Sequence, residues 1–106
     1  MYHFPHESLA VYQLARDLAR EYRSRTWPRG DAKLRDQGVR AAVSVVLNIA
    51  EGRSKRHGHR QYHYEIALGS AAEVTATLDL APFPDAAELQ ELWRRVGGML
   101  TRLMNV

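Results

Sequence analysis

The sequence concentrates positive charge in one short segment, residues 53–60, which reads Arg-Ser-Lys-Arg-His-Gly-His-Arg and contains no acidic residue. Arg and Lys side chains bind phosphate oxygens, and such contacts give an affinity for nucleic acid that falls as the salt concentration rises. Tyr62 and Tyr64 follow directly, and aromatic rings can stack on bases. No motif for reading bases is present, so backbone contacts are expected. The four fully charged candidates are Arg53, Lys55, Arg56 and Arg60.

A second basic set consists of Arg16, Arg20 and Arg23, whose spacing of four and three residues places them on one helix face. In an oligomer both basic sets would repeat and form a ring of charge. The plainer alternative is that residues 53–60 form a solvated loop and that the arginines belong to an ordinary helix surface.

Residues 40–51 are mostly apolar, but four polar residues at spacings of four, four and three form a polar line along this segment. Two more polar residues farther along the chain can join it in a buried hydrogen-bonded network, in which any buried charge must be paired. Such a network either lines a pore or ligand site or fixes helix register and subunit packing, and the structural interpretation is favoured. The predicted network comprises Arg40, Ser44, Asn48, Glu51, Ser70 and Glu73.

Three histidines, His57, His59 and His63, lie in or next to the basic segment. The i,i+4 spacing of His59 and His63 is one that metal-binding pairs use. No carboxylate stands at a helpful third position, however, and the basic neighbours repel a cation. We therefore expect no native metal site and no cofactor, and a metal-dependent enzyme is the least favoured hypothesis.

Four amphipathic segments must position these side chains. Apolar residues recur every three or four positions almost throughout, and no strand-like alternation is present. A helix around residues 11–22 is expected first, and the basic segment should be a connector. The pattern predicts an all-α, up-down-up-down four-helix bundle in a single domain, residues 1–106. The other three helices are expected at about Asp31–Glu51, His59–Ala81 and Asp85–Met104.

Local signals predict how these helices begin and end. Gly52 is expected to terminate the second helix as a C′ glycine. Asp85 with Glu88 three residues later resembles a capping box at the start of the fourth helix. Glu21 and Arg25 form an i,i+4 pair that is expected on the outside of the first helix.

The second helix is apolar nearly all round, because only Ser44 and Asn48 are polar between Ala41 and Ala50. A helix of this kind is normally covered on all sides, which a bundle of 106 residues can hardly achieve alone. We therefore expect a homo-oligomer; the alternative is a central helix with a few exposed alanines and valines. Gly69 on the third helix lies among small residues and predicts close approach of another helix.

The composition is that of an ordinary globular domain, with 45% hydrophobic and 25% charged residues and a net charge of +3. This balance excludes a disordered chain. The absence of cysteine excludes a disulfide framework. No signal peptide or membrane-spanning segment is recognisable, so a cytoplasmic protein without membrane partners is expected.

Two blocks of the sequence resemble the 23S ribosomal RNA intervening-sequence family: residues 40–52, which end in Asn-Ile-Ala-Glu-Gly, and residues 66–73. The chain departs from the pattern at Gly38, where a bulky aliphatic residue is usual, and at Val46, where many members carry proline. The positions that match are Gln37, Arg40, Ala41, Ser44, Asn48, Ile49, Ala50, Glu51, Gly52, Ala67, Gly69, Ser70 and Glu73.

The resemblance implies an antiparallel four-helix bundle that assembles as a ring-like homopentamer. Related bundles are accessory proteins of diversity-generating retroelements, where they bind nucleic acid and a reverse transcriptase. The hypothesis is a non-enzymatic accessory protein that binds an RNA or DNA backbone. The alternative is a structural or adaptor oligomer that binds a reverse transcriptase or another protein through apolar helix faces and Trp27, with no direct nucleic-acid role.

Overall fold

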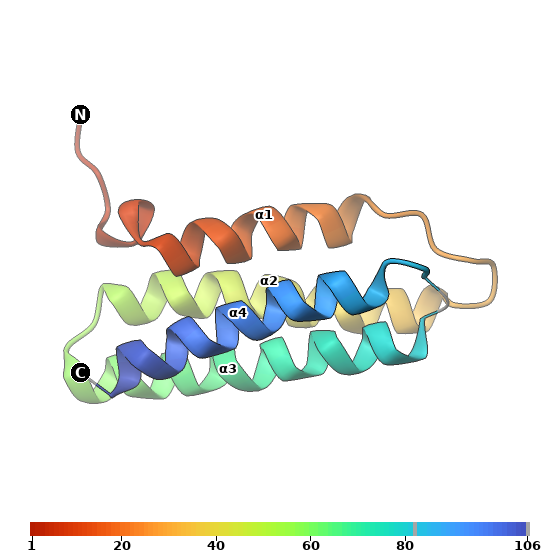
Figure 1. The fold of residues 1–106 in the computed structure, drawn as a ribbon. Coiled ribbons are helices and arrows are strands. Elements are labelled where there is room, and N and C mark those ends of the chain that lie inside the picture. The colour runs from red at the N-terminus through yellow and green to blue at the C-terminus, as the bar shows by residue number, and fades with distance from the viewer. Residues whose placement is uncertain (82, 106) are drawn as a thin grey trace.

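The computed structural model describes residues 1–81 and 83–105, which contain no β-strand. Successive helices run in opposite directions, so the chain runs along the bundle twice in each direction (Figure 1). This confirms the predicted all-α fold. The elements are a short 3-10 turn, η1 (Pro5–Ser8), and the helices α1 (Ala10–Ser24), α2 (Ala32–Arg53), α3 (His57–Leu80) and α4 (Ala86–Met104).

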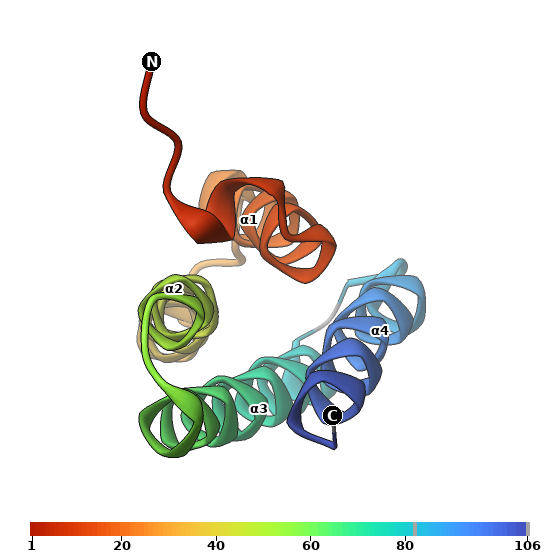
Figure 2. The same cartoon turned by 90° about the vertical axis from the view of Figure 1, so that its left-hand side faces the viewer.

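The four helices surround one core in chain order, and α4 lies beside α1 to close the bundle (Figure 2). Its largest fully buried side chains are Trp93, Tyr22 and Tyr64, and each is only 1% exposed. Burying side chains of this size contributes roughly 1.5–3 kcal/mol apiece. The buried positions on α1 and α4 recur every three or four residues, as predicted: Val11, Ala15, Leu18, Tyr22, Trp93, Val96 and Leu100.

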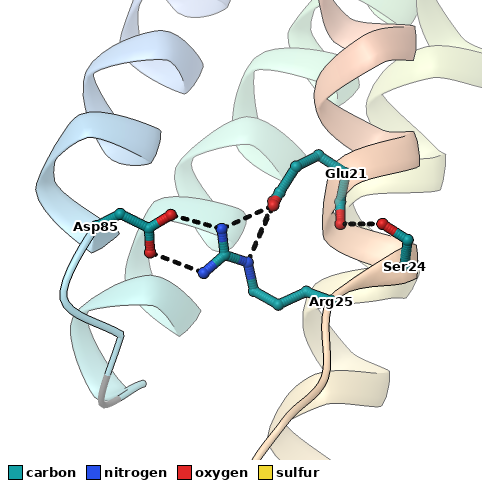
Figure 3. A network of polar contacts seen from close by, with 4 residues as sticks. All are labelled: Glu21, Ser24, Arg25 and Asp85. Atoms are coloured by element: carbon teal, nitrogen blue, oxygen red, sulfur yellow. Dashed lines mark hydrogen bonds and ion pairs between the residues drawn. The ribbon is translucent and has the colours of Figure 1, made fainter.

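An ion-pair network joins the end of α1 to the start of α4 (Figure 3). The Arg25 guanidinium donates two hydrogen bonds of 2.7 Å to the two carboxylate oxygens of Asp85, and its Nη2 donates a third, also of 2.7 Å, to Glu21 Oε2. The predicted Glu21–Arg25 pair is confirmed, although Arg25 is largely buried. The capping box is wrong: the Asp85 side chain does not cap α4, because its carboxylate is engaged by Arg25.

The connector between α1 and α2 folds back onto this end of the bundle. The ring of Trp27 lies 5.4 Å from Tyr22 and 4.8 Å from Phe83, measured between centroids. Arg25 stacks over the Phe83 ring at 4.6 Å. Trp27 is therefore half-buried in the packing of this end, and a contact between it and another protein stays a prediction.

The junction between α2 and α3 is shorter than the sequence indicates. Gly52 lies inside α2 and does not end it, and α3 begins at His57, so only residues 54–56 connect the helices. Gly52 is needed for close packing: a Cβ at this position would lie 2.8 Å from Cε1 of Tyr64. Gly69 shows the opposite, because nothing within the described part of the chain approaches a Cβ built there within 4 Å. Its expected close packing is absent within one chain.

Candidate nucleic-acid interface

The four predicted phosphate-binding residues gather at one end of the bundle, where α2 ends and α3 begins (Figure 1). Lys55 and Arg56 are exposed in the connector, while Arg53 on α2 and Arg60 on α3 are half-buried. The first turn of α3 contains no acidic residue, and no side chain in the described part of the chain caps its N-terminus. The partial positive charge of this helix end therefore adds to the charge of the side chains.

These basic residues do not all have the same freedom to bind a partner. Arg60 donates from Nε to the carbonyl of Gly52 and from Nη2 to that of Arg53, both at 3.3 Å. It thereby satisfies carbonyl groups at the C-terminus of α2, where a cation is favourable. Lys55 forms an exposed ion pair with Glu51 at 3.1 Å, and pairs of this kind contribute little stability. Arg60 thus has a structural role that the sequence did not indicate.

The two tyrosines that follow the basic segment differ in accessibility. Tyr62 is 60% exposed, and its ring meets His63 edge-on at 5.3 Å. Tyr64 is 1% exposed and belongs to the core. Tyr62 is available to stack on a base, whereas the prediction that Tyr64 does so is wrong.

The second basic set lines a hollow between α1 and α2. Arg16, Arg20 and Arg23 form its rim. Arg16 pairs with Asp17 at 3.0 Å, while Arg20 and Arg23 are exposed. The apolar floor consists of Ala19, Val43, Val46 and Leu47.

Leu47 connects the two basic sets along the outer face of α2. It lines the hollow beside α1 and also a second hollow that includes Phe4, Glu51 and Ser54. The second hollow leads toward the connector between α2 and α3, because Ser54, which lines this hollow, is the first residue of that connector. The four basic residues Arg53, Lys55, Arg56 and Arg60 define what we call the basic end of the bundle. The second basic set and the basic end therefore border one extended surface.

The polar line on α2 forms hydrogen bonds to α3, as the network prediction requires. Ser44 Oγ lies 2.9 Å from Ser70 Oγ, and Asn48 Nδ2 donates to the Ser44 carbonyl at 2.9 Å. Asn48 Oδ1 lies 2.9 Å from Nδ1 of His63. These side chains are half-buried between two helices, which fits a network that fixes helix register.

The composition of this network differs from the prediction in two ways. Arg40 and Glu51 lie outside it: both are exposed, and Glu51 pairs with Lys55. His63 belongs to it through its contact with Asn48. Glu73 is bonded by Gln37 Nε2 in a separate, exposed pair between the same two helices. Both contacts could have been predicted from the sequence, because α2 and α3 are antiparallel. Residues early in α2, such as Gln37, then lie opposite residues late in α3, and residues late in α2, such as Asn48, lie opposite residues early in α3.

The histidines do not form a metal site in the described ranges 1–81 and 83–105, where no group of three or more His, Asp or Glu side chains is placed to hold an ion. His63 is bonded to Asn48, and His59 is exposed. None of the helices in the described part of the chain is both long and apolar enough to cross a bilayer.

Comparison with known families identifies a family that this chain matches. The family described as 23S rRNA-intervening sequence protein matches residues 7–101, nearly the whole chain. No curated protein matches the sequence. The matched range includes all four helices except the last residues of α4, and with them both basic sets and the α2–α3 polar network.

Proposed function

This chain belongs to the 23S rRNA-intervening sequence protein family, and we propose that it is a non-enzymatic accessory protein that binds the backbone of a nucleic acid. The observation that carries the proposal is the gathering of Arg53, Lys55, Arg56 and Arg60 at one end of the bundle, beside an uncapped helix N-terminus. Four cations around a helix end that carries partial positive charge form a surface for phosphate groups.

RNA is the first nucleic acid to test, because the family description names an intervening sequence of 23S rRNA. Contacts to phosphates and stacking on the exposed ring of Tyr62 would give affinity with little dependence on sequence. The proposed site of action is the cytoplasm.

We further propose that the protein acts as a homo-oligomeric ring, with five copies as the resemblance implies. The supporting observation is the outer face of α2, where Leu47 is 62% exposed and Val43, Val46 and Ala50 are only half-buried. A second copy that covered this apolar face would remove it from water. Repetition of the basic end around a ring would multiply weak phosphate contacts.

The test is fluorescence anisotropy with labelled RNA and DNA oligonucleotides at 50 and 200 mM salt. The variant changes Arg53, Lys55 and Arg56 to Gln and keeps Arg60, because Arg60 caps α2. We expect weaker binding, and a slope of log affinity against log salt that is smaller in magnitude by about 2 for each bound chain.

The matched control changes three exposed arginines of α4, Arg94, Arg95 and Arg102, to Gln. It removes the same charge from another surface, so binding should change much less. Equal losses in both variants would mean that only net charge matters. Absence of binding at 50 mM salt would overturn the proposal.

A second candidate function is favoured by the hollow between α1 and α2. An apolar floor with an arginine rim suits an amphipathic helix that carries acidic residues. In this case the protein is an adaptor, and a reverse transcriptase is one candidate partner. Capture of a protein partner that resists salt and is lost in Leu47→Glu, without binding of oligonucleotides, would favour this function.

A further inference from the structure

A small cavity lies at the basic end, behind the connector between α2 and α3. It has a volume of about 130 Å³ and receives side chains from three helices. Leu103 of α4 forms one wall, and Gln61 holds the end of α4 in place by donating from Nε2 to the Met104 carbonyl at 2.6 Å. Its lining contains no carboxylate from the described residues. Its lining is Arg53, His57, Arg60, Gln61, Tyr64 and Leu103.

The side chains on α3 that line this cavity share one helix face. His57, Arg60, Gln61 and Tyr64 follow a spacing of three, one and three residues, which brings them to the same side of the helix. Arg53 faces them from the last turn of α2. Guanidinium, imidazole and amide groups therefore converge on one space, and all of them can donate hydrogen bonds.

Tyr64 is the unusual member of this set. Its side chain is 1% exposed, and its hydroxyl oxygen is buried without a hydrogen-bond partner among residues 1–81 and 83–105. Gly52 permits this placement, because the ring lies against the surface of α2 where a Cβ would otherwise stand. A buried hydroxyl without a partner costs free energy. A bound group that accepted a hydrogen bond from it would remove this cost.

The charges around the hydroxyl show which kind of group this is. Burial raises the pKa of Tyr64, and the positive charges of Arg60 and Arg53 act against this rise. The hydroxyl thus lies within the field of both guanidinium groups, and with its raised pKa it keeps its proton at neutral pH and is available as a hydrogen-bond donor. An acceptor that meets two cations and an O–H donor together is an oxyanion.

We propose that this cavity binds a terminal phosphate monoester, held by Arg53 and Arg60 and by a hydrogen bond from the hydroxyl of Tyr64. A monoester carries close to two negative charges and three free oxygens, which matches two cations and a buried donor. A group attached through a single ester oxygen also suits a cavity that α4 closes on one side. The proposed function gives the phosphate one source, the 5′ end of a nucleic acid; the other source is a free phosphate.

The experiment compares Tyr64→Phe with Tyr62→Phe. The first removes an oxygen that has no partner in the described part of the chain, so the fold should be retained, as circular dichroism would check. The second removes the same atom from an exposed ring two residues away. Arg53→Gln tests the charge, while Arg60 is kept because it caps α2.

The first arm measures thermal unfolding with inorganic phosphate against chloride at constant ionic strength. We expect phosphate to raise the melting temperature of the wild type and of Tyr62→Phe, but not that of Tyr64→Phe. The second arm measures anisotropy with one oligonucleotide carrying either a 5′-phosphate or a 5′-hydroxyl. The phosphate should strengthen binding about tenfold, the effect of a hydrogen bond to a charged group, and this preference should disappear in Tyr64→Phe and fall in Arg53→Gln.

The outcomes separate this inference from the proposed function. Salt-dependent binding of both oligonucleotides with equal affinity, without a specific effect of phosphate, would overturn the pocket and leave the nucleic-acid interface standing. A Tyr64-dependent effect of phosphate without binding of either oligonucleotide would support the pocket with free phosphate as its source, and would overturn the proposed function. A 5′-phosphate preference that survives both Tyr64→Phe and Arg53→Gln would place the phosphate elsewhere and refute the site.

Discussion

The hydroxyl of Tyr22 occupies the space where Gly38 would carry a side chain: a Cβ built on Gly38 would lie 1.7 Å from the hydroxyl oxygen and 2.3 Å from Cζ of the ring. The same hydroxyl lies 2.8 Å from Oγ1 of Thr77, at hydrogen-bonding distance. The tyrosine of α1 thus passes over α2 and reaches α3. Gly38, which departs from the usual bulky residue of the family pattern, is explained by this contact.

Gly38→Ala should therefore destabilise the protein. Alanine favours a helix over glycine by about 1 kcal/mol. The clash with Tyr22 opposes this gain, because the ring must move and lose its bond to Thr77. Overpacking costs typically about 1–3 kcal/mol, and an unsatisfied buried hydroxyl adds a similar amount, so a net loss of roughly 1–5 kcal/mol is expected in urea denaturation.

The control for this prediction is Gly98→Ala, since nothing lies within 4 Å of a Cβ at Gly98 on α4. This variant should gain up to about 1 kcal/mol of stability. A Gly38→Ala protein as stable as Gly98→Ala would show that Tyr22 does not fill the space beside α2.

The sequence predicted the four helices because burial imposes a period of three to four residues on each of them. It failed where a contact distant in the sequence overrides a local signal. Gly52 has the type and position of a helix-ending glycine, but the ring of Tyr64 packs on it inside α2. Asp85 has the type of an N-cap, but a bidentate bond to Arg25, sixty residues away, engages its carboxylate. The bidentate pair gives this carboxylate two parallel charge-assisted bonds in a fixed geometry.

The basic end could be predicted in the same partial way. The charge of a side chain follows directly from its residue type, so the four basic residues of the α2–α3 junction could be predicted from the sequence. Their separate roles were not, because the bonds of Arg60 to the α2 carbonyls and the burial of Tyr64 depend on how α2 and α3 pack. The cavity also needs Leu103 of α4, which no local pattern connects with the junction.

Stability should depend on pH through Asp85. Hydrogen bonds from Arg25 hold the pKa of Asp85 below its ordinary value of 3.8. The folded state then binds fewer protons than the unfolded state, so this contribution is fully present above pH 3.8 and is lost as the pH falls through the lower pKa of the folded state. Asp85→Asn should lower the melting temperature at pH 7, and its difference from wild type should shrink below about pH 4.

Arg25→Gln provides the second measurement for this ion pair. It removes the partner of Asp85, so its melting temperature should show the same reduced dependence on acid. Arg25→Gln also loses the bonds to Glu21 and the stacking on Phe83, so it should be the less stable of the two single variants. The double variant should lose little more than Arg25→Gln alone, because both changes remove the same bond between Arg25 and Asp85. Additive losses, or a gap between Asp85→Asn and wild type that persists at pH 2, would contradict the assignment.

The polar network between α2 and α3 predicts that Asn48→Leu is destabilising. Asn48 bonds the Ser44 carbonyl and Nδ1 of His63, so leucine leaves the half-buried imidazole without this partner. The expected loss is about 1–3 kcal/mol in the free energy of unfolding. Arg40→Leu changes another residue of the same polar line that lies outside the network, and it should stay within about 0.5 kcal/mol of wild type. Equal effects would mean that the network does not stabilise the helix pair.

The last prediction concerns assembly of the protein through the outer face of α2. Leu47 is 62% exposed in a single chain, and its half-buried neighbours extend the apolar surface. Leu47→Glu places a charge in this face, which is costly at a desolvated contact, so the mass measured by light scattering at micromolar concentration should fall toward that of one chain. Leu80 is 72% exposed near the end of α3, and Leu80→Glu provides the matched control that should leave the mass unchanged. A wild-type protein that is already monomeric, or a Leu47→Glu variant that keeps the oligomer mass, would show that this face of α2 is not where copies of the chain meet.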